Sequence, residues 1–163
     1  MDKALQVIRA LHSSGLIRAY AIGGGIAATY YIEPILTYDL DIFFIPTSEG
    51  LDVLSPIHKE LKRRRYSLDK ELVVIEGVPV QFIPVYNELV KEAVESAVES
   101  RYKKVRTRIL RPEYLVAIAV QTNRSKDRER ALQLASQTKL DAKLLTGLLN
   151  KYGLTDRYRK IKA

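Results

Sequence analysis

Two stretches of the chain decide its fold: Ala-Ile-Gly-Gly-Gly-Ile-Ala-Ala at residues 21–28 and Thr-Tyr-Asp-Leu-Asp-Ile at residues 37–42. The first stretch predicts a buried strand over 16–22 that runs through glycines into a short helix over 26–32. Glycine lets backbone N–H groups approach a phosphate closely, and a helix N-terminus carries partial positive charge. We therefore expect a phosphate-binding turn at this point of the chain.

The second stretch predicts a strand over 38–45 with two acidic residues on one face. Asp39 and Asp41 lie two positions apart, so their carboxylates project from the same side, while Leu40 and Ile42 point into the core. Neighbouring carboxylates repel each other, and a divalent cation between them and a nucleotide's phosphates would cancel that repulsion. Mg²⁺ typically uses one or two carboxylates together with phosphate oxygens. Either motif alone is commonly structural, but their combination favours a metal and nucleotide site.

Other residue types narrow the choice of metal and of chemistry. The chain has no cysteine, which excludes disulfides, thiol nucleophiles and thiolate metal sites. Its two histidines, His12 and His58, are far apart and lack metal-ligand spacing. Any metal must therefore be held by oxygen atoms, which favours a hard ion such as Mg²⁺.

The two stretches together resemble the signature of the nucleotidyltransferase superfamily, in which Gly-Gly or Gly-Ser precedes Asp-x-Asp on the next strand. More narrowly, residues 37–41 are similar to the abortive-infection (AbiEii-like) toxin branch of that superfamily. Residues 111–115 and 123–127 resemble the helix and the Arg-x-Lys-Asp motif of the same branch. The likeness extends from about Ile17 to Leu134. It implies an α/β (α+β) fold with a mixed sheet flanked by helices and a C-terminal helical region.

The resemblance implies a Mg²⁺-dependent transfer of a nucleoside monophosphate from a nucleoside triphosphate (NTP) to an RNA or protein acceptor. It also suggests a toxin that is paired with an antitoxin. Lys126 would contact a phosphate and Asp127 would orient it, although an ordinary surface ion pair is the alternative. The expected nucleotide-binding residues are Gly23, Gly24, Gly25, Thr37, Gln81 and Arg124. The expected catalytic residues are Asp39, Asp41, Lys126 and Asp127, with Asp39 and Asp41 as metal ligands.

Two departures from the family pattern motivate an alternative function. Superfamily enzymes usually carry a third carboxylate on a later strand, where this chain has Gln81, and an amide cannot accept a proton at neutral pH. Asp69, Glu71 or Glu76 could substitute only if a hairpin brought one of them inward. The branch also often has an arginine where this chain has Leu36. The alternative is therefore a catalytically impaired module that binds nucleotide or nucleic acid.

Periodicity and turn residues predict the remaining elements of a single domain, residues 1–163, with an α/β core over 1–110 and helices over 111–163 packed on it. The expected helices cover 3–14, 51–65, 86–99, 112–122, 125–137, 140–151 and 154–161. The expected strands cover 72–76, 78–85 and 102–110.

The net charge of +8 raises the question of a polyanionic partner. Basic residues cluster at 62–65, 101–111, 124–130 and 157–162, which fits either an RNA acceptor or solvated faces. A third reading is an interaction protein with a vestigial site, using the basic tyrosine-containing segments at 101–104 and 152–160. The start of the chain lacks a signal-peptide profile, and no apolar run approaches the roughly 20 residues of a membrane span. We therefore expect a cytoplasmic protein with no membrane association.

Overall fold

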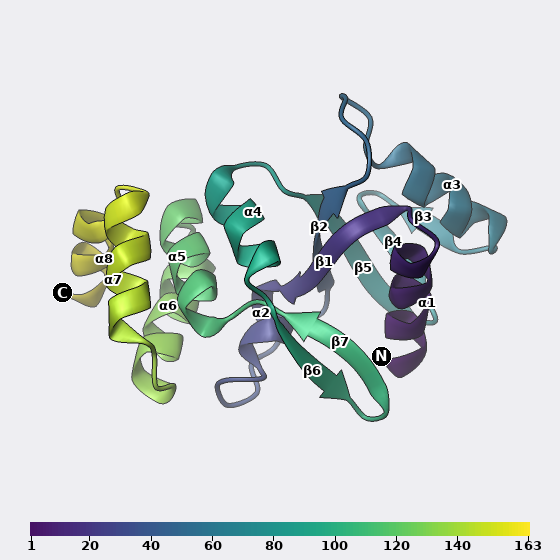
Figure 1. Cartoon of the computed structure of the whole chain (residues 1–163). Helices are drawn as coiled ribbons and strands as arrows, with labels where there is room; N and C mark the ends of the chain where they lie inside the picture. The colour runs from purple at the N-terminus through teal and green to yellow at the C-terminus, as the bar shows by residue number, and fades with distance from the viewer.

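The computed structural model describes all residues, 1–163, and centres on a seven-stranded mixed sheet with the order β3-β4-β5-β2-β1-β7-β6 (Figure 1). The central strands β1 and β2 are antiparallel, whereas β2 with β5 and β1 with β7 are parallel. The outer pairs are antiparallel hairpins. The strands are β1 Ile17–Gly23, β2 Leu40–Pro46, β3 Ser67–Asp69, β4 Leu72–Ile75, β5 Val78–Pro84, β6 Val98–Tyr102 and β7 Val105–Ile109.

Eight helices surround or extend this sheet. Helices α1 and α4 pack on β1, and the last four helices gather at one side of the sheet (Figure 1). The helices are α1 Asp2–Ser13, α2 Gly24–Ala28, α3 Ser55–Arg63, α4 Glu88–Glu95, α5 Pro112–Thr122, α6 Ser125–Gln137, α7 Ala142–Lys151 and α8 Thr155–Lys162. No helix is long and apolar enough to cross a membrane.

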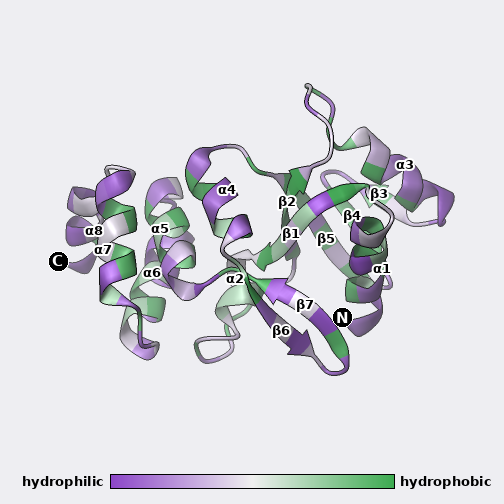
Figure 2. Ribbon diagram, in the orientation of Figure 1, coloured by the Kyte–Doolittle hydropathy of each residue, from purple (hydrophilic) through white to green (hydrophobic).

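The core is continuous from the sheet into the C-terminal helices. Four consecutive residues of β2, 42–45, are buried, as expected for a strand that is covered on both faces. Figure 2 shows hydrophobic residues concentrated on the central strands. Helix α5 is buried from Glu113 to Val120, on all its faces, and contacts α2, α4, α6 and α7. This helix therefore links the sheet to the rest of the helical region.

The structure changes the predicted elements around the two decisive stretches. The helix predicted over 26–32 begins earlier, at Gly24, and ends at Ala28. The strand predicted over 38–45 begins at Leu40, so Asp39 precedes it instead of lying on it. On one side, β1 ends at Gly23, which pairs with Asp41; on the other, the β5 residue opposite Asp39 is Pro79, which has no N–H to donate.

Two predicted elements break at turns. The helix predicted over 86–99 ends at Glu95, and residues 98–102 form strand β6 instead. A turn at Lys103, with φ of 52°, returns the chain into β7, so the strand predicted over 102–110 is half of a hairpin. The helix predicted over 51–65 is shorter, Ser55–Arg63. The edge strand β3 was not predicted because its three residues are all exposed and show no apolar alternation.

Candidate functional site

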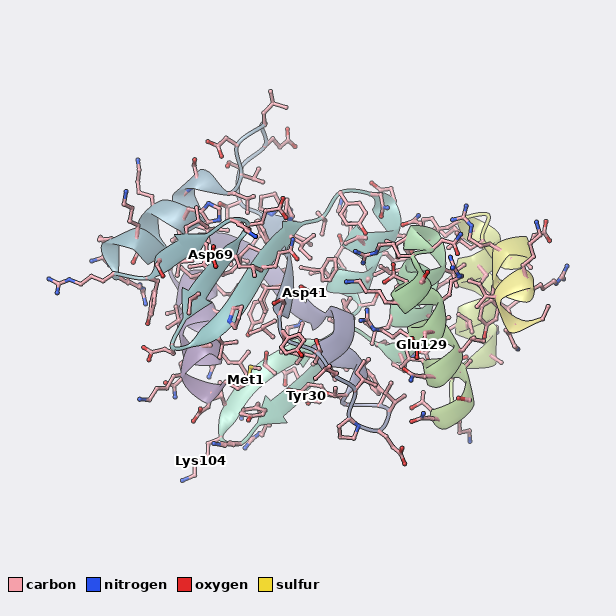
Figure 3. All side chains as sticks on the ribbon, turned by 180° about the vertical axis from the view of Figure 1, so that it is seen from behind. Met1, Tyr30, Asp41, Asp69, Lys104 and Glu129 are labelled. Atoms are coloured by element: carbon pink, nitrogen blue, oxygen red, sulfur yellow. The ribbon has the colours of Figure 1, made fainter.

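One cavity of about 260 Å³ lies between the ends of the central strands and helices α5 and α6. Figure 3 shows Asp41 at the side of the sheet that faces these helices. The cavity is slightly smaller than the roughly 300–1,000 Å³ of typical ligand pockets, so it would enclose a nucleotide only in part. Its lining residues are Gly24, Asp39, Asp41, Phe43, Gln81, Ile83, Tyr86, Leu110, Leu115, Ile118, Ala119, Thr122, Arg124, Lys126, Asp127 and Arg130.

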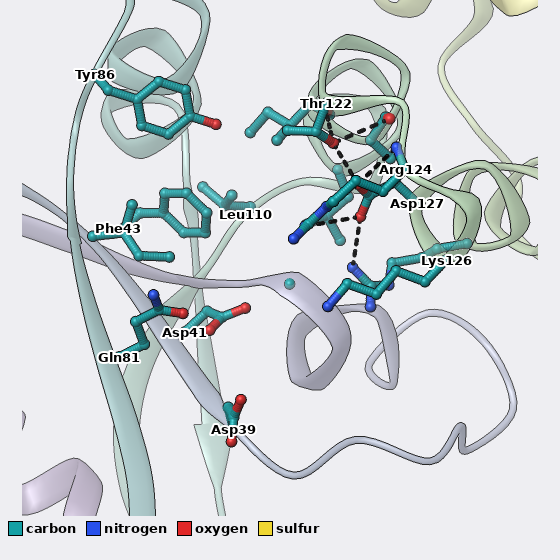
Figure 4. A pocket seen from close by; sticks show the side chains of 16 residues that line it. Asp39, Asp41, Phe43, Gln81, Tyr86, Leu110, Thr122, Arg124, Lys126 and Asp127 are labelled. Carbon is teal, nitrogen blue, oxygen red and sulfur yellow. Dashed lines mark hydrogen bonds and ion pairs between the residues drawn. The ribbon is translucent and has the colours of Figure 1, made fainter. Parts of the chain in front are cut away.

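The acidic side of the cavity is formed by Asp39 and Asp41 at the start of β2 (Figure 4). Burial and, to a smaller extent, the neighbouring Asp39 carboxylate raise the pKa of Asp41 to about 6, against the lowering effect of Arg130 and Lys126. A carboxylate that is buried beside a like charge is the arrangement that a divalent cation relieves. The charge balance here therefore fits a metal ion.

The glycines serve mainly to let Asp41 and Thr37 approach the backbone. Gly24 has φ of +60°, and a Cβ at this position would collide with Asp41 Oδ2. A Cβ on Gly25 would lie 2.7 Å from Thr37 Oγ1. Gly23, Gly25 and Thr37 do not line the cavity, although they were expected to bind the nucleotide. Helix α2 is also only five residues long, so its N-terminus contributes little of the predicted positive potential.

The basic side of the cavity comes from the start of helix α6. Arg124 is the N-cap of α6, and its backbone N–H donates to the carboxylate of Asp127, at the N3 position, at 3.2 Å. Asp127 is 2% exposed and accepts hydrogen bonds from Thr122 Oγ1 at 2.8 Å and from Arg124 Nε at 2.6 Å. Although burial by itself raises the pKa of Asp127, the hydrogen bonds from Arg124 and Thr122 outweigh it and hold that pKa below its usual value.

These contacts give Asp127 a different setting from the one predicted. No ion pair joins Lys126 to Asp127, so the alternative of an ordinary surface ion pair is wrong. The Asp127 carboxylate instead fixes the guanidinium of Arg124, which extends toward the cavity together with Lys126 (Figure 4). Asp127 is therefore placed to position Arg124.

Sequence reasoning missed Arg130, which also lines the cavity. Its side chain is 18% exposed, its Nη1 lies 3.9 Å from Asp127 Oδ1, and its buried Nε has no hydrogen-bond partner. The available signal was its spacing from Lys126, because residues four apart share one face of a helix. It also missed Tyr86 and Thr122, which no motif marks.

Gln81 lies directly beside Asp41, in register across the parallel pair β2 and β5. Its Nε2 is 3.5 Å from Glu71 Oε2, whereas Glu76 accepts a hydrogen bond from the Tyr66 hydroxyl. Asp69 is exposed on the edge strand β3. Of the three possible substitutes for a third carboxylate, only Glu71 thus contacts Gln81.

The oxygen atoms in the cavity fit a hard metal ion that a bound ligand also coordinates. No group of three or more His, Cys, Asp or Glu side chains could hold a metal by itself. The chain offers two carboxylates, Asp39 and Asp41, and the amide oxygen of Gln81. All are oxygen donors, and Mg²⁺ is usually held by one or two carboxylates while substrate phosphates complete its shell.

Comparison with solved structures places this geometry among known folds. A nucleotidyltransferase-like antigenic protein from Paracoccidioides brasiliensis aligns with a TM-score of 0.55 and 13% identity, over 99% of this chain and 93% of that one. The chain has a nucleotidyltransferase-like fold. ANT(2'')-Ia in complex with adenylyl-2''-tobramycin gives a TM-score of 0.53 and 16% identity, over 94% and 98% of the two chains. A solution structure of ANT(2'')-Ia gives 0.52 and 15%, over 99% and 97%.

No protein-family profile and no curated protein matches the chain. The nucleotidyltransferase-like fold confirms the fold class expected from residues 21–28 and 37–42. At these identities the likeness concerns the fold alone. The narrower likeness to abortive-infection toxins, which residues 37–41 and 123–127 suggest, stays a prediction.

Proposed function

We propose that this chain is a Mg²⁺-dependent nucleotidyltransferase that moves a nucleoside monophosphate from an NTP to an acceptor, with pyrophosphate as the leaving group. The observation that carries the proposal is the division of one cavity into two charged sides. The carboxylates of Asp39 and Asp41 lie on one side, and the cations of Arg124, Lys126 and Arg130 lie on the other. Such a pairing suits a ligand that binds a metal and carries several negative charges.

In this proposal the triphosphate spans the two sides. Asp39 and Asp41 would hold Mg²⁺, which when bound neutralises charge at the transferred phosphoryl group. Arg124, fixed by Asp127, and Lys126 donate to the outer phosphates. Arg130 offers its guanidinium from a partly buried position, where a charge-assisted hydrogen bond is stronger than in water. The chain's own contribution is therefore binding and alignment.

The nucleoside has an apolar wall to lie against. Phe43, Leu110 and Leu115 line the cavity next to Tyr86, which is 54% exposed at its rim (Figure 4). Ile118 and Ala119 of α5 continue this wall. Contact with such side chains and with an aromatic ring favours binding of a planar base. We place the base and sugar here, since the phosphates are drawn to the cations of α6.

Removal of the acceptor's proton is the step for which the site is least equipped. Gln81 occupies the position beside Asp41 but cannot accept a proton. Glu71, whose carboxylate contacts the Gln81 amide, is the candidate base, with Gln81 positioning the acceptor hydroxyl. The same feature favours the alternative function, a module that binds a metal–nucleotide complex without transferring it.

The acceptor is proposed to be RNA or protein. The net charge of +8 favours a polyanionic acceptor such as RNA. A toxin role and an antitoxin partner are supported by the sequence resemblance of residues 37–41 and 123–127.

The test is transfer of label from each α-labelled NTP, with Mg²⁺, to total RNA and to a cell protein extract. The wild type is compared with an Asp39→Asn, Asp41→Asn double variant and with a Glu49→Gln, Glu99→Gln double variant. The control pair removes the same charge from exposed positions outside the cavity. The proposal is supported if the wild type and the control pair transfer label to an acceptor and the Asp39→Asn, Asp41→Asn variant does not. Nucleotide binding without label from any NTP would favour the binding module.

A further inference from the structure

A second cavity, of about 380 Å³, lies next to the candidate site, and three of its five lining residues are cationic. Its residues are Asn123, Arg128, Arg157, Lys160 and Ile161. None of the five carries a carboxylate. It is formed where α6 and α8 contact each other. A cavity with this lining selects for an anion.

Backbone oxygens, and not carboxylates, hold the two arginines. Arg157 Nη1 donates to the carbonyl oxygens of Gln121 at 3.0 Å and Val120 at 3.3 Å. Arg128 Nη1 donates to the carbonyl oxygen of Asn123 at 2.6 Å, and its Nη2 donates to Ser125 Oγ at 3.2 Å. Their guanidinium groups are thus oriented in advance, while their charges are not neutralised by any ion pair.

The end of helix α5 explains this cluster only in part. The carbonyls that receive these bonds belong to the last turn of α5 and to its C-cap, Asn123, where the helix dipole favours cations. That dipole is equivalent to roughly half a negative charge. Against it stand three positive charges, those of Arg128, Arg157 and Lys160. The cavity therefore keeps a net positive charge that capping does not account for.

The second cavity continues directly from the candidate site. Thr122 and Arg124 line the candidate site, and Asn123, which lies between them in sequence, lines the second cavity. Arg124 and Arg128 lie at the start of the same helix. A ligand that leaves the NTP site over this loop meets the basic cavity next.

The distribution of charge along the chain points to a long anion. Residues 111–163 contain twelve of the 27 Lys and Arg but only five of the 19 Asp and Glu, so this third of the chain carries +7 of the net +8. The triphosphate proposed above engages three of those cations. Of the others, Arg111, Lys151 and Arg159 pair with carboxylates, whereas Arg128, Arg157 and Lys160 make no ion pair and are free to bind further phosphates.

We infer that the cavity of Arg128, Arg157 and Lys160 binds the phosphodiester backbone of a single-stranded nucleic acid. Guanidinium groups suit phosphate oxygens because their N–H donors form a fixed fork. Contacts of this kind position a strand and do not read its sequence. That the bound strand is the acceptor rests on the proposed nucleotidyltransferase function, because its end would then reach the nucleotide across Asn123 and Arg124.

The test is fluorescence anisotropy with the full chain and a labelled single-stranded RNA of 20 nucleotides, at several salt concentrations. An Arg128→Gln, Arg157→Gln, Lys160→Gln triple variant is compared with a Lys59→Gln, Lys62→Gln, Lys70→Gln triple variant. The control removes the same charge from exposed positions that make no ion pair. Thermal melting establishes that both variants fold, and Mg²⁺–NTP binding is measured by thermal shift in parallel.

We expect the first triple variant to bind the RNA at least tenfold more weakly and the control to bind within about twofold of the wild type. The slope of log affinity against log salt should fall by about 2, since each single-strand phosphate contact contributes roughly 0.7. A DNA oligonucleotide of the same length should show the same loss, because the contact is to the backbone.

Equal weakening of both variants would overturn the inference, because it would show diffuse charge and no local site. The inference would also be overturned if the wild type bound no oligonucleotide at physiological salt, even if it transferred label to protein. Loss of RNA binding in the first variant with unchanged Mg²⁺–NTP binding supports both proposals. Loss of RNA binding in a protein that binds no NTP at all would sustain the nucleic-acid site and refute the nucleotidyltransferase.

Discussion

At the scale of single residues, Asp41 is held in an environment that disfavours its own charge. It lies against Gly24, is in register with Gln81, and has Asp39 beside it. Burial and then the Asp39 carboxylate raise its pKa to about 6. Residues that hold ligands are often kept at a cost in stability. Asp41 is placed as such a residue.

Replacement of Asp41 by Asn should therefore stabilise the protein at pH 7.5 and abolish Mg²⁺-dependent nucleotide binding. Because the folded pKa of about 6 exceeds the unfolded value of 3.8, the native state binds more protons between these values. The free energy of unfolding of the wild type thus falls as pH rises through this window, by about 1–3 kcal/mol. Urea denaturation of both proteins at pH 4, 5, 6 and 7.5 measures the difference.

Asp52→Asn is the control, because this substitution should lower the free energy of unfolding at pH 7.5, whereas Asp41→Asn should raise it. The Ser55 side chain and backbone N–H hydrogen-bond the exposed Asp52 carboxylate and lower its pKa. Its stabilising contribution is present above the unfolded pKa and is lost as pH falls through the lower folded value. A gap between wild type and Asp41→Asn that stays constant over pH 4–7.5 would contradict the role given to Asp41.

Gly24→Ala should lose stability and nucleotide binding together. The backbone there has φ of +60°, and a Cβ would collide with Asp41 Oδ2. We expect a loss of about 1–3 kcal/mol in the free energy of unfolding. The matched control is Gly147→Ala in helix α7, where a Cβ meets no atom and alanine should stabilise by about 0.5–1 kcal/mol. Nucleotide affinity unchanged by Gly24→Ala would refute the close approach.

At the scale of elements, the start of helix α6 organises the basic side of the cavity. The Asp127 carboxylate accepts a hydrogen bond from the backbone N–H of Arg124, which caps the helix, and another from Arg124 Nε, which fixes the guanidinium. One turn later Arg130 lies on the same face as Lys126. Helix formation and ligand binding thus use the same residues.

Lys126→Gln and Arg130→Gln should each weaken NTP binding about tenfold or more, since a hydrogen bond to a charged group contributes about 1.5–3 kcal/mol. Arg130 should show the larger effect because it is the more buried of the two. Lys139→Gln, an exposed cation outside the cavity, is the control. Isothermal titration with Mg²⁺–NTP gives the affinities. If Arg130→Gln and Lys139→Gln bound Mg²⁺–NTP with equal affinity, Arg130 would not contact the nucleotide.

At the scale of the whole molecule, the cavity joins the sheet to the helical region. Asp41 and Gln81 belong to strands, whereas Lys126 and Arg130 belong to α6. The buried helix α5 connects the two parts and forms one wall of the cavity. A ligand that bridges the cavity would therefore stabilise both parts at once.

Saturating NTP with Mg²⁺ should raise the melting temperature of the wild type by about 5–10 °C. A ligand at 100 times its Kd adds roughly 2.7 kcal/mol, and each kcal/mol shifts a protein of this size by about 2–4 °C. Differential scanning fluorimetry with Mg²⁺ alone, NTP alone and both together measures it. A shift of equal size for the Asp39→Asn, Asp41→Asn variant would show that the ligand binds without these carboxylates.

Residue type and spacing predicted the fold class and nearly half of the residues that line the cavity. Consecutive glycines after an apolar strand, and an acidic pair on the following apolar strand, were enough to predict where β1, α2 and β2 meet. Seven of the ten expected site residues line the cavity; Gly23, Gly25 and Thr37 do not. Local patterns suffice here because burial of β2 and steric freedom at Gly24 depend on residue type and spacing.

The way in which these residues face one another follows from the tertiary structure. Arg130 and Tyr86 come from α6 and from the segment after β5, and nothing local marks them as neighbours of Asp41. The pairing of Gly23 with Asp41 set the start of β2 and left Asp39 outside the strand. The partner of Asp127 was likewise settled by the capping geometry of α6. Contacts between segments distant in sequence depend on packing, which residue spacing within one element does not encode.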